Sequence, residues 1–273
     1  MIKLGLQFFG GRGSASGGGT TGGGSTKVLS TESLLSASGK TTEINQVMDA
    51  VKAVADDYGV NLYDMRVATL DKKSQGTMAY YDNSGNLAVN KNYFDSKKMD
   101  GAYDDCVKEG YHPKRGNKSG LEAVSAHELG HALSEEVGRK LGYGDWQLDK
   151  ASNKIISEAK KQGGFKSVGA IRKGISGYAQ KNNAEAIAEA FADVYCNGNK
   201  AKKASKAVVD VLNSYFGRYM IMAKEKYVEP DDFMPKGIRK KHGLGEFAEE
   251  EKKKGNRTLD DAFKEYEKKN KKK

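Results

Sequence analysis

The sequence predicts an α+β fold, with one ordered domain between two polar ends. Strand-like segments gather in the first half of the chain and helical periodicity dominates the second half, which is the order expected of an α+β domain. Hydrophobic residues make up 37% of the 273 residues and charged residues 30%, so we expect ordered structure over only part of the length. We place a flexible glycine- and serine-rich arm at residues 1–40, the domain at 41–222 and a charged, partly helical tail at 223–273.

The composition of the two ends does not favour a packed core. Residues 10–24 contain nine glycines, and such a segment cannot bury enough apolar area to offset its chain entropy. The net charge of the chain is +10, of which residues 236–273 contribute +6, from 14 Lys and Arg against 8 Asp and Glu. This basic tail can make weak, salt-sensitive contact with nucleic acid or an acidic partner. No basic motif interleaved with aromatic residues makes nucleic acid the main ligand.

The first half of the domain is expected to hold one helix and a small sheet. Apolar residues recur at helical spacing from Ile44 to Tyr58, and Gly59 ends the pattern. Strand-like segments follow, and glycine and asparagine between the last two predict a β-hairpin. These segments cover residues 61–70, 77–81 and 87–94. We expect the sheet to be mostly antiparallel, and a polar, partly helical stretch and a loop to lead from it to the second half.

Four helices are predicted in the second half. Ser119 and Glu122 have the spacing of a capping box, which begins a helix that ends near Gly138. The other three helices are expected at residues 146–161, 182–195 and 203–216.

The segment HELGH, residues 127–131, has the pattern of a zinc site on a helix. His127 and His131 are four residues apart, so a helix places both on one face, where their imidazoles can reach one metal ion. Glu128 lies about 100° around the helix from His127 and can act as general base on a water molecule without binding the metal. Small and apolar residues between these three indicate a buried helix, in which polar groups need partners. We therefore expect Zn²⁺ as a cofactor.

A catalytic zinc ion needs a third protein ligand. His112 and His242 are candidates, but the residues after HELGH lack the continuation found in H-x-x-G-x-x-H proteins. Better candidates lie in the next part of the chain, where Glu185, Glu189 and Asp193 follow at intervals of four among small and apolar residues. Either Glu185 is the ligand, or Glu189 is the ligand and Asp193 supports a histidine.

HELGH, followed about fifty residues later by Tyr178, Glu185 and the segment AEAFA, resembles the catalytic domain of anthrax lethal factor and the related Pro-Pro endopeptidases. These are zincins of the gluzincin type. The resemblance covers roughly residues 76–197, and it implies a zincin-like metallopeptidase domain with an active-site helix. It also implies that His127, His131 and Glu185 bind zinc and that Glu128 is the general base.

Two further residues acquire expected roles from the same resemblance. Tyr178 stands seven residues before Glu185, as the tyrosine of the family does, and would hydrogen-bond the oxyanion or assist as an acid. Glu189 would hold the other ring nitrogen of a histidine. Because this arrangement also explains Tyr178, we prefer Glu185 to Glu189 as the third ligand.

The resemblance also indicates how substrate would bind. In zincins an edge strand lies over the active-site helix and pairs with extended substrate, and residues Leu87–Phe94 fit that place in chain order. Such pairing provides affinity with little demand on the substrate sequence.

The opening of the chain suggests a biological setting. Its segment LQFFGGRG resembles the starts of tailed-phage head and minor capsid proteins from Gram-positive hosts. We expect a phage- or prophage-encoded zinc endopeptidase that acts on a protein or peptide substrate, with virion proteins among its possible partners. The alternatives are a virion structural protein that keeps a zincin scaffold and a toxin effector domain.

The sequence also predicts where the protein acts. No apolar run approaches the roughly 20 residues that span a bilayer, and the opening residues make a poor secretory signal. Cys106 and Cys196 lie far apart and form neither a disulfide framework nor a CxxC motif. We expect two buried thiols and a protein in the cytoplasm of a bacterial host or in the virion.

Overall fold

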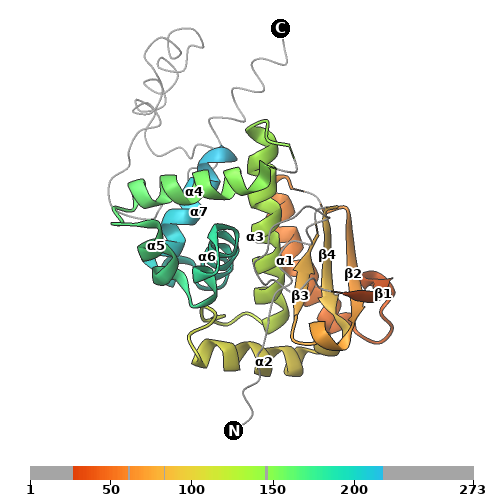
Figure 1. The fold of residues 1–273 in the computed structure, drawn as a ribbon. Coiled ribbons are helices and arrows are strands. Elements are labelled where there is room, and N and C mark those ends of the chain that lie inside the picture. Colours follow the sequence, from red (N-terminus) through yellow and green to blue (C-terminus); the bar gives the residue numbers. More distant parts are fainter. Residues whose placement is uncertain (1–26, 61, 83, 145–146, 218–273) are drawn as a thin grey trace, which may run out of the picture. The chain divides into compact units, whose positions relative to one another are not determined.

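The computed structural model describes residues 27–60, 62–82, 84–144 and 147–217, and these form an α+β arrangement of helices and one sheet (Figure 1). The residues of the predicted tail, 223–273, lie outside the described part of the chain, as do residues 1–26 of the predicted arm. The strands are β1 (Val28–Ser33), β2 (Asp64–Leu70), β3 (Ala79–Tyr81) and β4 (Asn86–Asn90). The α-helices are α1 (Thr41–Tyr58), α2 (Ser96–Lys108), α3 (Gly120–Lys140), α4 (Leu148–Gln162), α5 (Val168–Ile175), α6 (Asn183–Asn197) and α7 (Lys203–Tyr215).

The sheet is four-stranded and mixed, with the order β1-β2-β4-β3. β1 pairs with β2 and β3 with β4 in antiparallel fashion, whereas β2 and β4 run parallel. The predicted hairpin is present, as β3 and β4. β1 lies within residues 1–40, so the prediction of a flexible arm is wrong for this segment, where backbone pairing with β2 compensates for the exposure of every β1 side chain.

The prediction of an edge strand at Leu87–Phe94 is also wrong. β4 lies between β2 and β3, every residue of β4 is buried, and Lys91–Tyr93 form a 3-10 turn. β3 is the edge strand on the side of α3. A hairpin pattern shows that two strands pair, but it does not show which of them a third strand joins, and here β2 joins β4.

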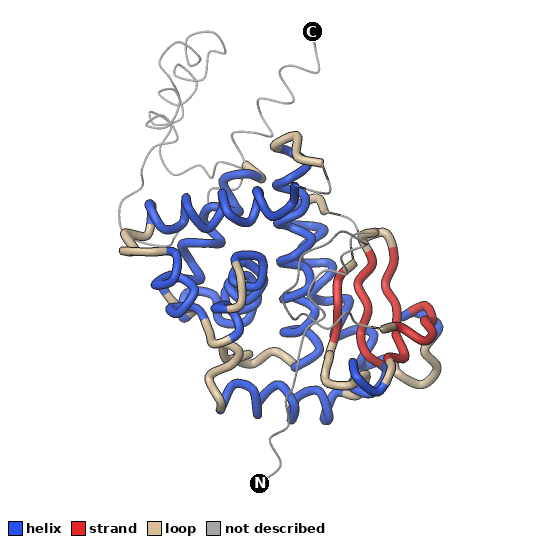
Figure 2. The backbone as a smooth tube through the Cα atoms, viewed as in Figure 1, coloured by secondary structure: helices blue, strands red, loops and turns tan. Residues whose placement is uncertain are grey.

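Helix α3 is the central element of the described residues. Figure 1 shows it between the sheet and the helices of the second half, and Figure 2 shows the strands gathered on one side of it. From Gly120 to Gly138 every α3 residue except Glu136 is buried. One set of its residues packs in the helical core with α4, α6 and α7, and another set packs in the core beneath the sheet. Within HELGH, Leu129 packs in the helical core, and α3 residues before HELGH pack beneath the sheet.

The ends of the helices confirm the local sequence signals. The Ser119 hydroxyl accepts from the Glu122 backbone N–H at 3.1 Å, and the Glu122 carboxylate accepts from the Ser119 N–H at 2.9 Å, which completes the capping box. Gly59 ends α1 with a left-handed φ of 64°. The pattern did not predict α5, an eight-residue helix with only two buried residues.

Two glycines allow elements to approach the site closely. A Cβ at Gly130 would lie 2.7 Å from the Ala188 Cα, so only glycine permits α3 and α6 to cross at this distance. A Cβ at Gly177 would lie 3.0 Å from the Gly110 carbonyl oxygen. The first contact brings α6 against the HELGH turn, and the second brings the segment before α6 against the loop after α2.

Cys106 and Cys196 are free and buried in the core beneath the sheet, as the sequence predicted. Among the described residues, no helix combines the length and the apolar character needed to cross a membrane.

Candidate metal centre

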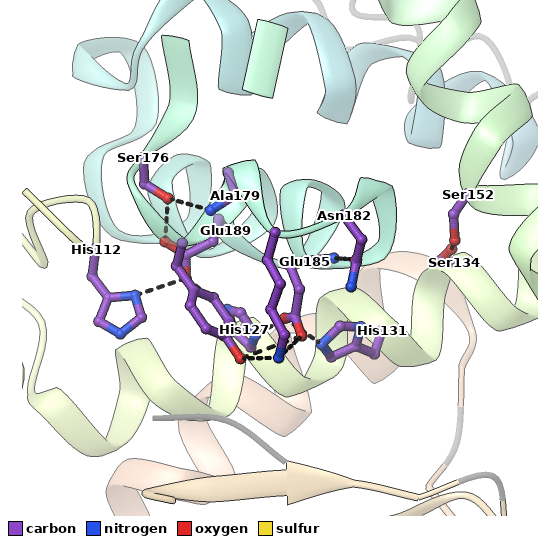
Figure 3. A network of polar contacts seen from close by, with 12 residues as sticks. His112, His127, His131, Ser134, Ser152, Ser176, Ala179, Asn182, Glu185 and Glu189 are labelled. Atoms are coloured by element: carbon purple, nitrogen blue, oxygen red, sulfur yellow. Dashed lines mark hydrogen bonds and ion pairs between the residues drawn. The ribbon is translucent and has the colours of Figure 1, made fainter. Parts of the chain in front are cut away.

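Three side chains from two helices meet at the middle of α3. His127 and His131 lie one helical turn apart on α3, and Glu185 lies on α6 (Figure 3). The Nε2 atoms of both histidines lie 3.3 Å from Oε2 of Glu185. One ligand atom from each of the three residues lies within 4.8 Å of the others. The structure thus brings together the three residues that the sequence analysis preferred as metal ligands.

Glu189 faces the opposite edge of the His127 ring. Its Oε1 accepts a hydrogen bond from His127 Nδ1 at 2.8 Å. In the neutral ring, which is the form that binds a metal ion, this bond keeps the proton on Nδ1 and leaves the Nε2 lone pair directed toward the candidate site. Burial raises the pKa of Glu189, but the His112 and His127 rings outweigh it and lower the pKa to about 2.

His112 and Ser176 complete the surroundings of Glu189. His112 Nδ1 donates to Glu189 Oε1 at 3.0 Å, and the Ser176 hydroxyl donates to Oε2 at 2.7 Å. From the sequence, His112 was a candidate ligand, whereas no role was predicted for Ser176. His112 is one of only four histidines in the chain, which is the signal that drew attention to it, whereas nothing in the local pattern marks Ser176.

Asp193 lies outside this cluster. Its carboxylate accepts from the Asn197 side chain at 2.9 Å and from the Lys202 backbone N–H at 2.9 Å, and so it joins α6 to the start of α7. The geometry does not match the alternative in which Glu189 binds metal and Asp193 supports a histidine. His242 lies outside the described residues.

Glu128 is buried on α3, with 1% of its surface exposed. Neither of its carboxylate oxygens has a hydrogen-bond partner of good geometry among the described residues. Burial raises the pKa of Glu128 to about 8, with the charge of Glu185 adding to the effect and the His127 ring and the Tyr81 backbone N–H opposing it. A positive charge nearby would favour the ionised form.

Tyr178 and Lys181 contact Oε1 of Glu185, whereas Oε2 faces the two histidines. The Tyr178 hydroxyl donates to Glu185 Oε1 at 3.3 Å, and the Lys181 ammonium lies 3.2 Å from that hydroxyl and 3.5 Å from Oε1. Burial and the nearby carboxylates raise the pKa of Tyr178 above its usual range, so it stays protonated and able to donate. Lys181 was not predicted from the sequence, although its position four residues before Glu185 is the spacing of a helical ion pair.

The residues present fit a divalent cation such as Zn²⁺. Two imidazoles and one carboxylate are the ligand set of many catalytic zinc sites. Burial lowers the pKa of His127, but Glu185 and Glu189 outweigh it and raise the pKa to about 10. The cluster therefore favours a positive charge, and a metal ion can supply that charge in place of a proton.

Comparisons with models of protein families, with curated proteins and with solved structures found no match to this chain.

Proposed function

We propose that this protein is a zinc-dependent endopeptidase in which His127, His131 and Glu185 bind the metal. The observation that carries the proposal is the convergence of two Nε2 atoms and one carboxylate oxygen on a buried point beside Glu128. The spacing of HELGH accounts for the first two atoms, and the close crossing of α3 and α6 at Gly130 accounts for the third.

Each residue of the cluster has a defined chemical task in this proposal. A zinc ion held by His127, His131 and Glu185 would supply Lewis acidity and would lower the pKa of water. Glu128, which is buried and has no hydrogen-bond partner of good geometry among the described residues, would accept the proton of the attacking water and pass it to the leaving amine. Tyr178 would donate its proton in a hydrogen bond to the oxygen on which negative charge develops, in place of its hydrogen bond to Glu185 Oε1.

Substrate binds along β3 in this proposal, and not along β4. β3 is the edge strand and is attached to α3 through the Tyr81 hydroxyl, which donates to Glu135 Oε2 at 3.1 Å. A hydrogen bond from the backbone N–H of Tyr81 lowers the pKa of Glu128. The end of β3 therefore lies beside the proposed base. An extended peptide paired with β3 would pass close to Glu128.

The presence of Glu128 favours an enzyme over an inactive virion scaffold. A scaffold can use metal ligands for stability, but a buried carboxylate that lacks well-formed hydrogen bonds destabilises the fold. Retaining such a group is expected where it takes part in a reaction. The phage or prophage setting remains a proposal that rests on the opening residues, which lie outside the described part of the chain.

The test is to measure zinc content and peptide cleavage on the full chain, using a peptide library as substrate. Glu128→Gln keeps the shape of the side chain and removes the base, so we expect zinc to stay bound and cleavage to fall by at least about 10²-fold. Glu109→Gln, an exposed change at the end of α2, is the matched control and should cleave normally. Undiminished cleavage by Glu128→Gln would eliminate the proposed mechanism.

A further inference from the structure

The Glu189 carboxylate is held by three donors from three separate segments. His127 comes from α3, His112 from the loop after α2, and Ser176 from the residue that follows α5. The donor–acceptor distances are 2.8, 3.0 and 2.7 Å. The side chains of His112 and Glu189 are 0% and 1% exposed, so water does not compete for these bonds.

We propose that His112 and Ser176 are positioning residues that set the metal affinity of the site by fixing Glu189 against His127. This inference rests on the proposed metal site. It does not depend on the reaction that the site performs.

The donors around Glu189 allow one favourable hydrogen-bond arrangement of its carboxylate. A carboxylate only accepts, so His112 presents a protonated Nδ1 to it. The Ser176 oxygen accepts from the Ala179 backbone N–H at 3.0 Å, which directs its own proton to Glu189 Oε2. With both oxygens engaged, the carboxylate cannot rotate without breaking a buried hydrogen bond.

The orientation of Glu189 controls the orientation of His127. Oε1 receives the Nδ1 proton of His127, and this bond holds the ring so that Nε2 lies 3.3 Å from Glu185 Oε2. If Glu189 turned, the ring could turn with it and Nε2 would leave the point where the other two ligand atoms meet. Residues that support a metal-binding histidine in this way typically alter metal affinity by about 10- to 100-fold.

The surroundings of His112 fix its ring as well. The ring stacks on the fully buried Tyr103, with centroids 5.4 Å apart and planes at 16°. The edge of Tyr111 packs against it at 5.3 Å. The imidazole therefore cannot swing away from Glu189 without disturbing a packed aromatic cluster.

The segments that carry His112 and Ser176 are also joined to each other. The Gly177 N–H donates to the Gly110 carbonyl at 2.9 Å, and the Tyr178 N–H donates to the Tyr111 carbonyl at 3.0 Å. The absence of a side chain at Gly177 allows this approach. The two donors thus reach Glu189 as parts of one connected backbone unit.

The experiment measures the zinc dissociation constant of the full chain by competition with a chromophoric chelator. Ser176→Ala and His112→Phe each remove one donor, and His112→Phe keeps the aromatic stacking on Tyr103. We expect both variants to bind zinc about 10- to 100-fold more weakly than the wild type. His112→Asn, whose amide can donate from nearly the same place as Nδ1, should restore most of the affinity.

Two controls separate positioning from general loosening of the fold. Ser152→Ala removes a buried serine whose hydroxyl contacts Ser134 and not Glu189, so zinc affinity should not change. Combining Ser176→Ala with Glu189→Gln should weaken binding no more than Glu189→Gln alone, because Ser176 acts through Glu189. Thermal unfolding of the metal-free variants identifies any that fail to fold.

The outcomes distinguish this inference from the proposed function. Wild-type affinity in folded Ser176→Ala and His112→Phe overturns the inference, as does an equal loss in Ser152→Ala. A wild-type protein that binds zinc tightly but cleaves no peptide contradicts the proposed peptidase and leaves the inference intact. A wild-type protein that binds no zinc overturns both.

Discussion

Glu185 and Glu189 stand one turn apart on α6 and are equally buried, yet they have different partners. Glu185 faces the Nε2 atoms of two histidines, whereas Glu189 faces the Nδ1 atom of His127 and two further donors. One imidazole has two nitrogens on opposite edges, so two carboxylates spaced by a helical turn can contact both edges of it. The identity of the partner atoms, and not the residue type, therefore decides which glutamate is suited to bind metal.

Tyr178 is expected to act on the reaction more than on metal binding. Tyr178→Phe removes the hydroxyl but keeps the buried ring, so we expect zinc content to be unchanged and kcat/KM to fall by about 10²- to 10³-fold, as on loss of one oxyanion donor. Tyr215→Phe is the control, because its hydroxyl contacts Glu158 between α7 and α4. If Tyr178→Phe lost zinc and activity in the same proportion, Tyr178 would be a support of Glu185 and not a catalytic residue.

At the scale of residues, helical geometry predicted that His127 and His131 would meet, and the family resemblance, which also explained Tyr178, selected Glu185 as the third candidate ligand. A helix alone brings the two imidazoles of HELGH together, and the capping-box spacing of Ser119 and Glu122 predicted that helix. Spacing did not decide between Glu185 and Glu189, because residues four apart share one face of a helix. His112 and Glu189 lie 77 residues apart in the chain, so no local sequence pattern predicts their contact.

At the scale of elements, the site depends on how closely α3 and α6 cross. Glu185 and the two histidines meet because Gly130 allows the Ala188 backbone to lie against α3. Gly130, the residue before His131 in HELGH, thus has a packing function.

Gly130→Ala tests this crossing. The added methyl group would meet the Ala188 Cα at 2.7 Å and the Phe191 Cβ at 3.2 Å, so the helices must separate, and we expect unfolding to become easier by about 1–3 kcal/mol and zinc binding to weaken. Gly101→Ala, at a position of α2 with no atoms within 4 Å of the new Cβ, is the control and should stabilise the protein by about 0.5–1 kcal/mol. Urea unfolding measures both changes, and similar stability of the two variants would contradict the close crossing.

The capping box of α3 predicts a pH dependence of stability. Burial raises the pKa of Glu122, but the Ser119 backbone N–H and Lys118 outweigh it and lower the pKa below its ordinary value of 4.5. A lowered folded-state pKa means that the ionised group stabilises the fold above pH 4.5 and that this contribution is lost as the pH falls through the folded-state value.

Glu122→Gln is therefore expected to be less stable than the wild type by about 1 kcal/mol at neutral pH, with the difference disappearing in acid. Urea unfolding across the acid range measures this difference. Glu109→Gln, which alters an exposed glutamate at the end of α2, should show no such trend. A difference that stays constant with pH would mean that the Glu122 charge does not contribute.

At the scale of the whole molecule, the fold class and most elements followed from the sequence, whereas the order of the strands did not. Helices with a strong apolar periodicity were predicted within a few residues of their ends. β1 was missed because all its side chains are exposed, so that it carries no burial pattern. α5 was missed because only Ile171 and Ile175 are buried in its eight residues.

The proposed metal site links distant parts of the described chain, which predicts that metal binding and stability are coupled. Its candidate ligands lie on α3 and α6, more than fifty residues apart, and Glu189 adds the loop after α2 through His112. Because the unfolded chain cannot hold these atoms together, we expect zinc to bind the folded state selectively. A ligand at 1,000 times its Kd stabilises the folded state by about 4 kcal/mol, and for a domain of this size each kcal/mol shifts Tm by about 2–4 °C.

Chelation of zinc is therefore expected to lower the Tm of the full chain by about 10 °C, and re-addition of zinc to restore it. Differential scanning calorimetry with and without EDTA measures the change. Glu185→Gln, which removes the ligand contributed by α6 and keeps its shape, is the matched control and should respond weakly to EDTA. Equal shifts in the two proteins would show that the chelator acts elsewhere. A wild-type Tm that is the same with and without bound zinc would show that the metal does not connect α3 with α6 in the folded state.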